Sequence, residues 1–574
     1  MFAQYLCMMA VFRAFYEQKG EPMTELLTAA QMKAIEAAAI ASGEVTGLEL
    51  MERAGRGVVD AVFAEWPELA AGTFRAVVLC GPGGNGGDGF VVARLLKEWG
   101  WEVEVFLYGD PNRLPPDARV NYERWLAMGA VGVASAFDPW NTDAALYVDA
   151  LFGIGLSRCL VADALLVAKA LENSARNHST KLVSIDVPSG LCADSGRDIS
   201  EGSLWAMWPD LTVSFGYAKL GHVLGNGAQH CGKLVIKSIG LEPRKAMHAL
   251  GERYDPVKKT KPKGLVVGLL EGIDLGPGFS APDSILDKGW VENSGHKYTH
   301  GHALILSGPP GKGGAARLAA RGALRIGAGL VTVACPQGAL AENAARLDAV
   351  MLRVVDDGAG LATVLEDARI NALCIGPGLG LDARAAGVVA TSLAVSRSRI
   401  KSGTAQPLRI VLDADALTLI ARDPALFDLL HEYCVLTPHG GEFARLFPDI
   451  AAQLAAPATT GPAYSKVDAC REAAARAGCV VLFKGADTVI ADPSARCSIN
   501  SAHYDRAAPW LATAGSGDVL AGFITGLLAR GFAPMQAAET AAWLHVECAR
   551  SFGPGLIAED LAEELPKVFR ALRM

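Results

Sequence analysis

The sequence predicts an α/β protein built from two domains. Alanine-rich stretches with helical periodicity alternate with short runs of β-branched residues, the pattern of helices layered on a largely parallel sheet. A chain of 574 residues is too long for one ordinary core, and 51% hydrophobic with 20% charged residues is a globular composition. The alternation stops near residue 243 and restarts near residue 302, so we expect the domain break there.

Each domain carries its own series of predicted strands. Those of the first domain are residues 74–81, 101–109, 144–153, 181–190 and 211–216. Those of the second are residues 302–309, 330–336, 372–380, 409–417, 434–442 and 479–492. We therefore expect domains at 26–242 and 296–574, an N-terminal extension at 1–25 and a Lys/Pro-rich linker at 243–295. The extension lacks the basic start of a signal peptide, and Arg13 and Glu17 interrupt its apolar run.

Charge and cysteine usage narrow the function to small-molecule chemistry. A formal net charge of −8 argues against a nucleic-acid partner, which would favour a basic surface. The twelve cysteines are scattered without a C-x-x-C pair, which indicates reduced thiols in the cytoplasm. No run approaches the ~20 apolar residues that cross a membrane. We expect small-molecule substrates and a homo-oligomer.

The stretch "CGPGGNGGDGF", residues 80–90, has the Gly81-x-Gly83-x-x-Gly86 spacing of a dinucleotide-binding turn. Glycines between a strand and a helix let backbone N–H groups approach an anion at the helix N-terminus. A glycine-rich turn without a ligand is the alternative. Asn85 and Asp88 put an amide and a carboxylate inside the loop, so it is equipped for more than a pyrophosphate.

Polar residues also follow two other predicted strands of the first domain. Asp149 is followed by a second glycine loop at Gly153, and Asp186 and Ser189 lie in "SIDVPSGL". Because ligand sites of open α/β sheets lie at the carboxyl ends of strands, we expect these residues to converge with Asn85. Helix caps or turns are the alternative role of each acid taken alone.

In order, "ELMERAG", "GNGGDGFVVAR", "VDALFGIGL", "SIDVPSGL" and "LTVSFGYAKLG" resemble the NAD(P)H-hydrate epimerase half of bifunctional NAD(P)H-hydrate repair enzymes, over residues 26–241. The resemblance implies a Rossmann-like three-layer domain, an isomerase acting at C6 of hydrated NADH or NADPH, and a potassium ion held by Asn85, Asp149 and Ser189. Asp186 would be the catalytic acid/base, with Arg113 or Lys219 as an unranked second group. The implied substrate contacts are Gly84, Asn85, Gly86, Gly87, Asp88, Gly153, Ile154, Gly155, Leu156, Ser157, Arg158, Cys159 and Asp186.

The second domain offers two glycine-rich motifs of unequal value. "SGPPGKGG" is not a P-loop, because Leu306 and Gly313 stand where that motif needs Gly and Ser or Thr. "LATAGSGDVLAGFITGLLARG", residues 511–531, predicts a small-residue turn opening a helix, which would form an anion hole for a phosphoryl group. Asp518 would sit at its mouth and take a proton from an attacking hydroxyl. The alternative is that Asp518 only stabilises its own helix N-terminus.

This motif, with "CIGPGLG", "VLDADAL", "LTPHGGEFARL" and "VLFKGADTVIAD", resembles the ribokinase-like ADP-dependent (S)-NAD(P)H-hydrate dehydratase half of the same family, over residues 296–572. The resemblance implies a ribokinase-like three-layer domain and a lyase that phosphorylates the C6 hydroxyl from ADP, with Mg²⁺, and then expels phosphate. Ala315, Gly378, His439 and Asp518 would contact the hydrate, with Asp518 catalytic. Lys484, Gly485, Ala486, Asp487, Thr488 and Gly517 would bind the nucleotide.

Two other functions are weighed against repair of hydrated NAD(P)H. One is a ribokinase-like vitamin kinase fused to a nicotinamide-dependent oxidoreductase, which Asp88 inside the glycine loop and "TPHGGE" disfavour. The other is an RNA-associated scaffold, which the acids Asp88, Asp149 and Asp186 disfavour. One departure from the family stands out: "AAPWLATAGSGD" lacks the Asn-x-Gly-Met of many relatives, which puts the contact of that Asn in doubt.

Overall fold

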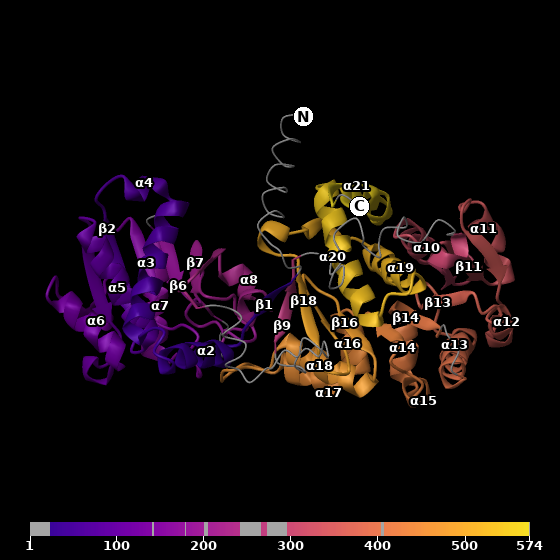
Figure 1. Cartoon of the computed structure of the whole chain (residues 1–574), viewed down its shortest axis with the longest axis horizontal. Coiled ribbons are helices and arrows are strands. Elements are labelled where there is room, and N and C mark those ends of the chain that lie inside the picture. Colours follow the sequence, from indigo (N-terminus) through magenta and orange to yellow (C-terminus); the bar gives the residue numbers. More distant parts are fainter. Residues whose placement is uncertain are drawn as a thin grey trace. The chain divides into compact units, whose positions relative to one another are not determined.

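The computed structural model describes residues 23–139, 143–177, 180–199, 205–241, 266–271, 296–402 and 407–572. The chain forms two compact units (Figure 1). Of the described residues, those within 25–267 and 454–466 form the first unit, and those within 268–453 and 467–572 form the second together with residues 23 and 24. Segment 454–466 therefore belongs by its contacts to the first unit, although it follows most of the second in sequence.

The first unit is a parallel seven-stranded sheet in the order β4-β3-β2-β5-β6-β7-β8. Its strands are β2 (Arg75–Cys80), β3 (Glu102–Leu107), β4 (Val131–Val133), β5 (Leu146–Ala150), β6 (Lys181–Ile185), β7 (Leu211–Phe215) and β8 (Lys233–Lys237). Its helices are α2 (Ala29–Ala41), α3 (Gly47–Glu65), α4 (Pro67–Ala70), α5 (Gly84–Glu98), α6 (Pro116–Leu126), α7 (Ala162–Asn177) and α8 (Gly227–His230). The order reverses between β2 and β5, which places a ligand crevice at their carboxyl ends.

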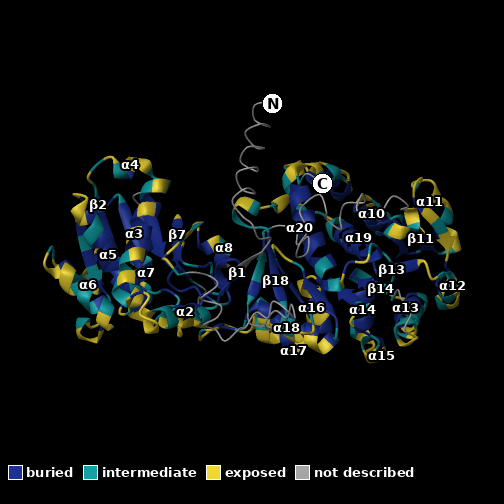
Figure 2. Ribbon diagram, viewed as in Figure 1, coloured by how far each residue is buried: buried dark blue, intermediate teal, exposed yellow. Residues whose placement is uncertain are grey.

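Alternate residues of β2 enter different cores, which makes the unit three-layered. Val78 and Cys80 join a cluster with Val58 and Phe90 of α3 and α5. Val77 and Leu79 join a second cluster that includes Leu171 of α7. Because successive side chains of a strand point to opposite faces, helices cover both faces of the sheet, and strands such as β2 and β7 appear buried in Figure 2. The predicted Rossmann-like layering is confirmed.

The second unit contains an eleven-stranded mixed sheet in the order β1-β9-β18-β17-β16-β15-β14-β13-β10-β11-β12. Its strands are β1 (Met23–Leu26), β9 (Val267–Leu270), β10 (His302–Leu306), β11 (Leu330–Cys335), β12 (Met351–Val354), β13 (Ile370–Ile375), β14 (Arg409–Leu412), β15 (Cys434–Leu436), β16 (Val480–Phe483), β17 (Asp487–Ala491) and β18 (Cys497–Ser501). From β16 to β12 the pairs are parallel, and β17 is antiparallel to both neighbours. The order reverses between β13 and β10, which marks the second expected crevice.

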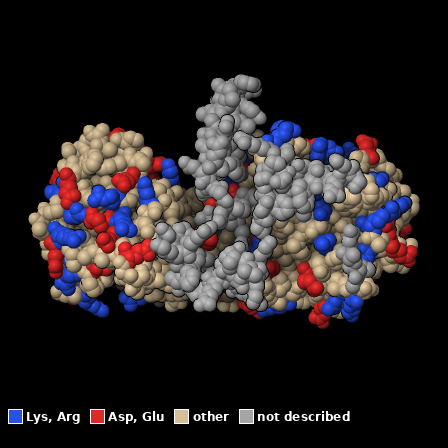
Figure 3. Space-filling view, viewed as in Figure 1, with Lys and Arg blue, Asp and Glu red and all other residues tan. Residues whose placement is uncertain are grey.

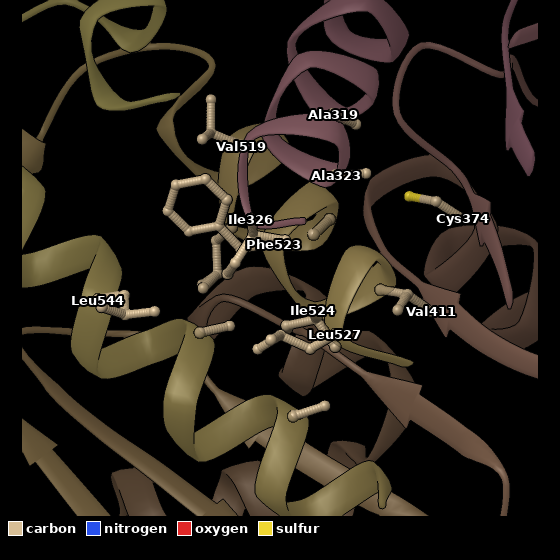
Figure 4. Packing of buried hydrophobic residues seen from close by; sticks show 14 of the residues in the cluster. Ala319, Ala323, Ile326, Cys374, Val411, Val519, Phe523, Ile524, Leu527 and Leu544 are labelled. Carbon is tan, nitrogen blue, oxygen red and sulfur yellow. The ribbon is translucent and has the colours of Figure 1, made fainter. Parts of the chain in front are cut away.

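Helices of the second unit cover this sheet, and one pair of them packs unusually closely. The helices are α10 (Gly314–Arg325), α11 (Leu340–Ala344), α12 (Gly358–Val364), α13 (Ala383–Lys401), α14 (Ala414–Arg422), α15 (Pro424–Phe427), α16 (Gly440–Leu446), α17 (Pro448–Ala455), α18 (Lys466–Ala477), α19 (Ser516–Ala529), α20 (Pro534–Phe552) and α21 (Ala558–Ala571). Figure 4 shows α10 and α19 meeting through Ala319, Ala323 and Phe523. A Cβ on Gly522 of α19 would lie 2.2 Å from the Ala319 carbonyl oxygen, so glycine permits this approach.

The structure departs from the sequence expectations in a few places. The run 479–492 is two antiparallel strands, β16 and β17, instead of one strand. The segment expected to be an irregular linker contains β9, and residues 242–265 and 272–295 of it lie outside the described residues. Of the expected N-terminal extension, residues 1–22 lie outside the described residues and β1 begins at Met23. None of the helices in the described ranges combines the length and apolarity that crossing a bilayer requires.

Candidate active sites

The glycine motif of the first unit lies at the reversal between β2 and β5. Its residues from Gly84 onward form the first turns of α5, so the predicted loop is largely a helix N-terminus. A Cβ on Gly81 would lie 1.7 Å from the Leu151 carbonyl oxygen, and one on Gly86 would lie 2.0 Å from the Gly81 oxygen. These glycines therefore let the chain after β2 approach the chain after β5. Helix geometry leaves the N–H groups of the first turn without intrahelical acceptors, facing the crevice.

The second glycine loop brings predicted residues from three strands together. A Cβ on Gly153 would lie 2.9 Å from Asn85 Oδ1 and 3.3 Å from Asp186 Oδ2. The Ile154 N–H donates to Asp186 Oδ2 at 3.4 Å. Asn85, Gly153, Ile154 and Asp186 thus lie close together, as predicted, whereas residues 157–159 contact residues 459–461. The buried Nδ2 of Asn85 has no hydrogen-bond partner.

Asp149 is fully buried at the end of β5. Its Oδ1 accepts hydrogen bonds from Ser189 Oγ at 2.6 Å and the Leu151 N–H at 3.2 Å. Its Oδ2 accepts from Ser184 Oγ at 2.8 Å and the Ser189 N–H at 3.0 Å. Burial raises the pKa of Asp149, and these hydrogen bonds oppose the rise. All four donors are neutral, so a cation beside this carboxylate would stabilise its charge.

Asp186 follows β6 and forms a buried ion pair with Lys219. Its Oδ1 lies 3.2 Å from Lys219 Nζ and accepts from Ser214 Oγ at 2.8 Å. Lys219 is 1% exposed, and its Nζ also donates to Ser214 Oγ and to the carbonyl oxygens of Phe215 and Tyr217. Burial alone would raise the pKa of Asp186, but Lys219 and the hydrogen bonds outweigh it and hold that pKa below its usual value. Asp186 therefore stays ionised.

The backbone around Asp186 is also constrained. Its φ of 66° is in the left-handed region, where residues other than glycine are uncommon. His222 Nδ1 accepts from the Lys219 N–H, so Nε2 carries the ring proton and donates to the Asp186 carbonyl oxygen at 3.0 Å. Burial and Lys219 lower the pKa of His222 to about 4, which keeps the ring neutral. His222 was not predicted from the sequence.

The negative charge of Asp186 affects two further carboxyl groups, those of Asp88 and Glu36. Burial, and then the charges of Asp186 and Glu36, raise the pKa of Asp88 well above its usual value. Burial and Asp186 raise the pKa of Glu36 on α2, while Lys219 and Lys33 oppose this. Asp88 was predicted, but nothing in the alanine-rich sequence around Glu36 distinguishes it. These carboxyl groups disfavour the RNA alternative, and Figure 3 shows acidic and basic side chains intermixed over the visible surface.

The structure ranks the two candidates for a cationic group in this site. Lys219 pairs with Asp186, as described above. Arg113 ends a short 3₁₀ helix at Pro111–Arg113 and is exposed. In the described structure it forms no ion pair with Asp186. Lys219 is therefore the cation associated with the predicted catalytic residue.

In the second unit, predicted residues also meet at the strand-order reversal. Gly378, after β13, has φ 65°, and a Cβ there would lie 2.5 Å from the Lys312 carbonyl oxygen and 3.8 Å from Ala315 Cβ. A Cβ on Gly308, after β10, would lie 1.7 Å from the Gly378 carbonyl oxygen. The loops after β10 and β13 are thus in contact, and Ala315 lies beside Gly378, as the resemblance implied.

The predicted small-residue turn lies at the N-terminus of α19. Gly515 is its N-cap with φ 89°, and a side chain there would meet Leu318 and Ala558. Ser516 Oγ donates to the carbonyl oxygens of Leu511 and Thr513, which closes the turn. The first intrahelical bond runs from the Val519 N–H to the Gly515 oxygen, so the preceding N–H groups have no acceptor within the helix. Asp518 lies in this first turn, half-buried.

Lys484 links Asp518 to two other carboxylates. Its Nζ lies 2.8 Å from Asp413 Oδ1 and 3.7 Å from Glu442 Oε2. A Cβ on Gly517 would lie 3.6 Å from the same Nζ. Burial, followed by Asp413 and Glu442, raises the pKa of Asp518 to about 6 although Lys484 opposes this. Asp518 can thus exchange a proton near neutral pH.

Asp413 is a site residue that the sequence reasoning missed. It is 2% exposed, follows β14 and occupies the N-cap position before α14, within the quoted "VLDADAL". The sequence pattern that pointed to Asp186, an acid directly after a buried strand, is present at Asp413 as well. The next residue, Ala414, has φ 47°, which is a strained conformation for alanine.

The remaining predicted residues have structural roles in the described contacts. His439 caps α16. Its Nδ1 accepts a hydrogen bond from the Gly441 N–H, and Glu442 Oε2 accepts one from the His439 N–H. The His439 side chain is nevertheless 57% exposed, so the rest of the ring can contact a ligand. Residues 484–486 form the turn between β16 and β17, and Thr488 Oγ1 on β17 closes it through hydrogen bonds with Gly485. Ala486 accepts from the Ala502 N–H, and Asp487 begins β17.

Comparison with known proteins identifies a family for each part of the chain. Residues 47–221 match the family described as YjeF-related protein N-terminus, and residues 303–567 match the NAD(P)H-hydrate dehydratase family. The bifunctional NAD(P)H-hydrate repair enzyme of Moorella thermoacetica is 34% identical over 95% of this chain and 97% of its own length. The NAD(P)H-hydrate epimerase of Roseobacter litoralis is 44% identical over 38% of this chain and 100% of its own length.

One solved structure among those similar to this chain is the ADP/ATP-dependent NAD(P)H-hydrate dehydratase of Bacillus subtilis, co-crystallised with ATP and Mg²⁺. It is 27% identical over 49% of this chain and 93% of its own length, with a TM-score of 0.38. The full-length relatives and the two matched families, which together cover most of the sequence, decide the assignment. This chain belongs to the family of bifunctional NAD(P)H-hydrate repair enzymes.

Proposed function

We propose that the first unit equilibrates the R and S hydrates of NADH and NADPH at C6, and that the second unit dehydrates the S hydrate with ADP. One observation carries this proposal: each crevice contains carboxyl groups whose pKa values are displaced in the direction that proton transfer requires. The oxidoreductase and vitamin-kinase alternative is not favoured, because the relatives over the whole length are repair enzymes.

In the epimerisation, we assign opposite roles to Asp88 and Asp186. Asp88, whose pKa is raised, protonates the C6 hydroxyl, which leaves as water while the ring nitrogen lone pair stabilises the planar C6 cation. Water returns to the other face and gives a proton to Asp186, whose pKa is held low by Lys219. The C–O bond broken on one face is re-formed on the other, and the proton passed to Asp186 balances the one given by Asp88.

Potassium is proposed at Asn85, Asp149 and Ser189. The fit rests on the buried Asp149 carboxylate, whose four hydrogen-bond donors are neutral, and on Asn85, whose buried amide nitrogen has no partner. A flipped Asn85 amide would place its oxygen at that position, and oxygen donors suit a hard cation. When bound, the ion would neutralise the charge of Asp149 and fix the loops after β2, β5 and β6 relative to one another.

In the dehydration, Asp518 takes the proton of the C6 hydroxyl as that oxygen attacks the β-phosphoryl group of ADP. The O–P bond forms, AMP leaves, and the C6 phosphate then departs with a C5 proton to restore the dihydropyridine ring. The N–H groups that begin α19 stabilise the phosphoryl oxygens, and Lys484 beside Gly517 binds the nucleotide phosphates. Residues 485–488 and Gly517 would hold the nucleotide. The hydrate would contact Ala315, Gly378 and His439.

Magnesium fits the second crevice as a partner of the nucleotide. Asp413, Glu442 and Asp518 gather around one lysine, which leaves a surplus of negative charge. Among the described side chains no group of three is already arranged as a metal site, and Mg²⁺ commonly takes one or two carboxylates plus substrate phosphates. When bound, the ion would neutralise the phosphoryl oxygens.

The experiment that tests the function uses separately prepared R and S hydrates. The S hydrate with ADP should regain NADH absorbance, and the R hydrate should do so only while the first unit is active. Asp186→Asn should block use of the R hydrate and leave the S hydrate reaction intact, with Asp117→Asn on α6 as a control. An S hydrate that stays unconverted with ADP and with ATP would refute the assignment.

Two further expectations concern the location of the protein and its oligomeric state. None of the eleven cysteines among the described residues forms a disulfide, which suits the reducing cytoplasm that we propose as the location. A homo-oligomer stays a prediction, which sedimentation of the full chain would measure.

A further inference from the structure

A short segment between α17 and α18 pairs with the second glycine loop of the first unit. The Gly461 N–H donates to the Ser157 carbonyl oxygen at 3.1 Å, and Cys159 Sγ donates to the Thr459 oxygen at 3.0 Å. Arg158 and Thr460 form an antiparallel bridge. These contacts lie within the first unit, to which residues 454–466 belong. We call residues 456–464 the strap.

One arginine of the first unit holds both ends of the strap. Arg197 donates through one guanidinium nitrogen to the Tyr464 carbonyl oxygen at 3.3 Å and through the other to the Ala456 carbonyl oxygen. Arg197 lies in the turn that follows Ser189, closed by bonds from Cys192 N to the Arg197 oxygen and from Ile199 N to the Gly190 oxygen. The strap is therefore tied to the same turn that carries the predicted potassium ligand Ser189.

The strap also packs tightly against apolar groups. Ala458 and Ala463 are buried with Cys192 and Ile199, and Leu156 and Cys159 of the loop pack against this cluster. Gly461 stands where no side chain fits, because a Cβ would lie 2.8 Å from the Leu156 carbonyl oxygen and 3.1 Å from Ile199 Cδ1. The fit between strap and loop is thus specific in both hydrogen bonding and shape.

The loop needs such support. Residues 151–161 contain no helix or extended strand, so ordering them costs conformational entropy that local hydrogen bonds must offset. Near its start the loop is held at the catalytic crevice, where Phe152 N donates to Ser189 Oγ and Ile154 N donates to Asp186 Oδ2. Near its end it is held by the strap. The strap is therefore the anchor opposite the reacting centre.

We propose that the strap is a positioning element for the epimerisation: residues that follow α17 in sequence hold the loop 153–159 in the conformation that binds the hydrate. This rests on the proposed contact between that loop and the substrate. An epimerase domain isolated at residue 242 would lack the strap, so epimerisation would depend on the continuous chain.

The test compares four full-length variants with the unchanged chain. Arg197→Ala removes both carbonyl contacts, and Arg197→Lys keeps the charge and one donor group. Gly461→Ala introduces the clash with the loop, and Gly387→Ala on α13 is its matched control, since a Cβ there meets nothing within 4 Å. We measure amide hydrogen exchange of residues 153–159, kcat and KM for the R hydrate, and dehydration of the S hydrate.

Arg197→Ala and Gly461→Ala should speed exchange in the loop about tenfold and raise KM for the R hydrate severalfold with a smaller change in kcat. Arg197→Lys should recover part of the effect, and Gly387→Ala and the S hydrate reaction should be unaffected. Unchanged loop exchange in both disruptive variants would overturn the proposal, and so would a loss confined to kcat. If the unchanged chain did not epimerise at all, the proposed function would fail, and the exchange data would still decide whether the strap anchors the loop.

Discussion

Replacing Asp518 by asparagine should remove dehydration and at the same time make the second unit more stable. The two effects have one cause. Burial, Asp413 and Glu442 raise the pKa of Asp518 to about 6, so its ionised form is both the base that the reaction needs and a destabilised charge in the folded state. Asparagine keeps the shape, cannot take the proton and carries no charge. The Asp518→Asn variant therefore shows whether this carboxylate takes part in the reaction or only caps its helix.

The magnitude follows from the displaced pKa. A rise from 3.8 to about 6 corresponds to about 3 kcal/mol of ionisation cost, and partial solvent exposure reduces this to about 2 kcal/mol. A raised pKa means that stability is complete at low pH and is lost as the pH rises through about 6. Asp518→Asn should thus stabilise the unit above pH 7, by about 4–8 °C in melting temperature, and the gain should vanish towards pH 4. The dehydration rate should fall about 10²- to 10⁴-fold.

The assay follows NADH absorbance with the S hydrate and ADP, together with thermal unfolding between pH 4 and pH 8. In the unchanged chain the rate should rise with pH and reach half its plateau near pH 6, where Asp518 ionises. Asp560→Asn is the matched control, because Asp560 lies in the first turn of α21 and its Oδ2 accepts the Ile557 N–H. Equilibration of the R and S hydrates should be unaffected in both variants.

The capping alternative predicts the opposite sign. If Asp518 only stabilised the N-terminus of α19, its replacement would destabilise the unit by up to about 1 kcal/mol and leave much of the activity. Asp560→Asn should behave in that way. A destabilised, active Asp518→Asn variant would therefore refute both the assigned role and the electrostatic reasoning.

Three further predictions address the first crevice and the packing of the second. Lys219→Met should raise the pKa of Asp186, because the ion pair that lowers it is lost, and the acid limb of the epimerisation pH profile should move to higher pH; an unmoved limb would contradict the pairing. Asp149→Asn should abolish any stimulation of epimerisation by K⁺ over Na⁺ and leave dehydration unchanged, as measured in the two chloride salts; retained stimulation would exclude Asp149 from the site. Gly522→Ala should lower the melting temperature of the second unit and slow dehydration, because its Cβ would lie 2.2 Å from the Ala319 oxygen and push α19 away from α10; an unchanged melting temperature would show that this contact relaxes freely.

Central strands could be predicted from the sequence because burial on both faces leaves continuous apolar runs. β2, β5 and β13 are such strands, and their predicted ranges contain or largely overlap the observed ones. Edge strands gave no such signal: β4 and β12 are short, and none of their residues is buried. β18, with the sequence "CSINS", is buried but polar, so periodicity could not reveal it.

The candidate sites divide in a similar way. Residues in glycine motifs or directly after strands could be found, since backbone geometry demands those residue types there, as at Gly81 and Gly378. Glu36 and His222 could not, because their importance comes from distant partners that only the fold brings near. The strap was beyond sequence reasoning for the same reason, since Gly461 meets Leu156 across some 300 residues.

The two crevices use a lysine differently, and the difference explains their acid–base behaviour. Lys219 is buried against a single carboxylate at ion-pair distance, so its charge outweighs burial and Asp186 stays ionised. Lys484 is shared, with Asp413 at 2.8 Å and Glu442 at 3.7 Å, so its charge does not offset the burial and the neighbouring carboxylates that raise the pKa of Asp518 to about 6. At neutral pH Asp518 is therefore mostly ionised but can still be protonated, whereas Asp186 is held in the ionised form.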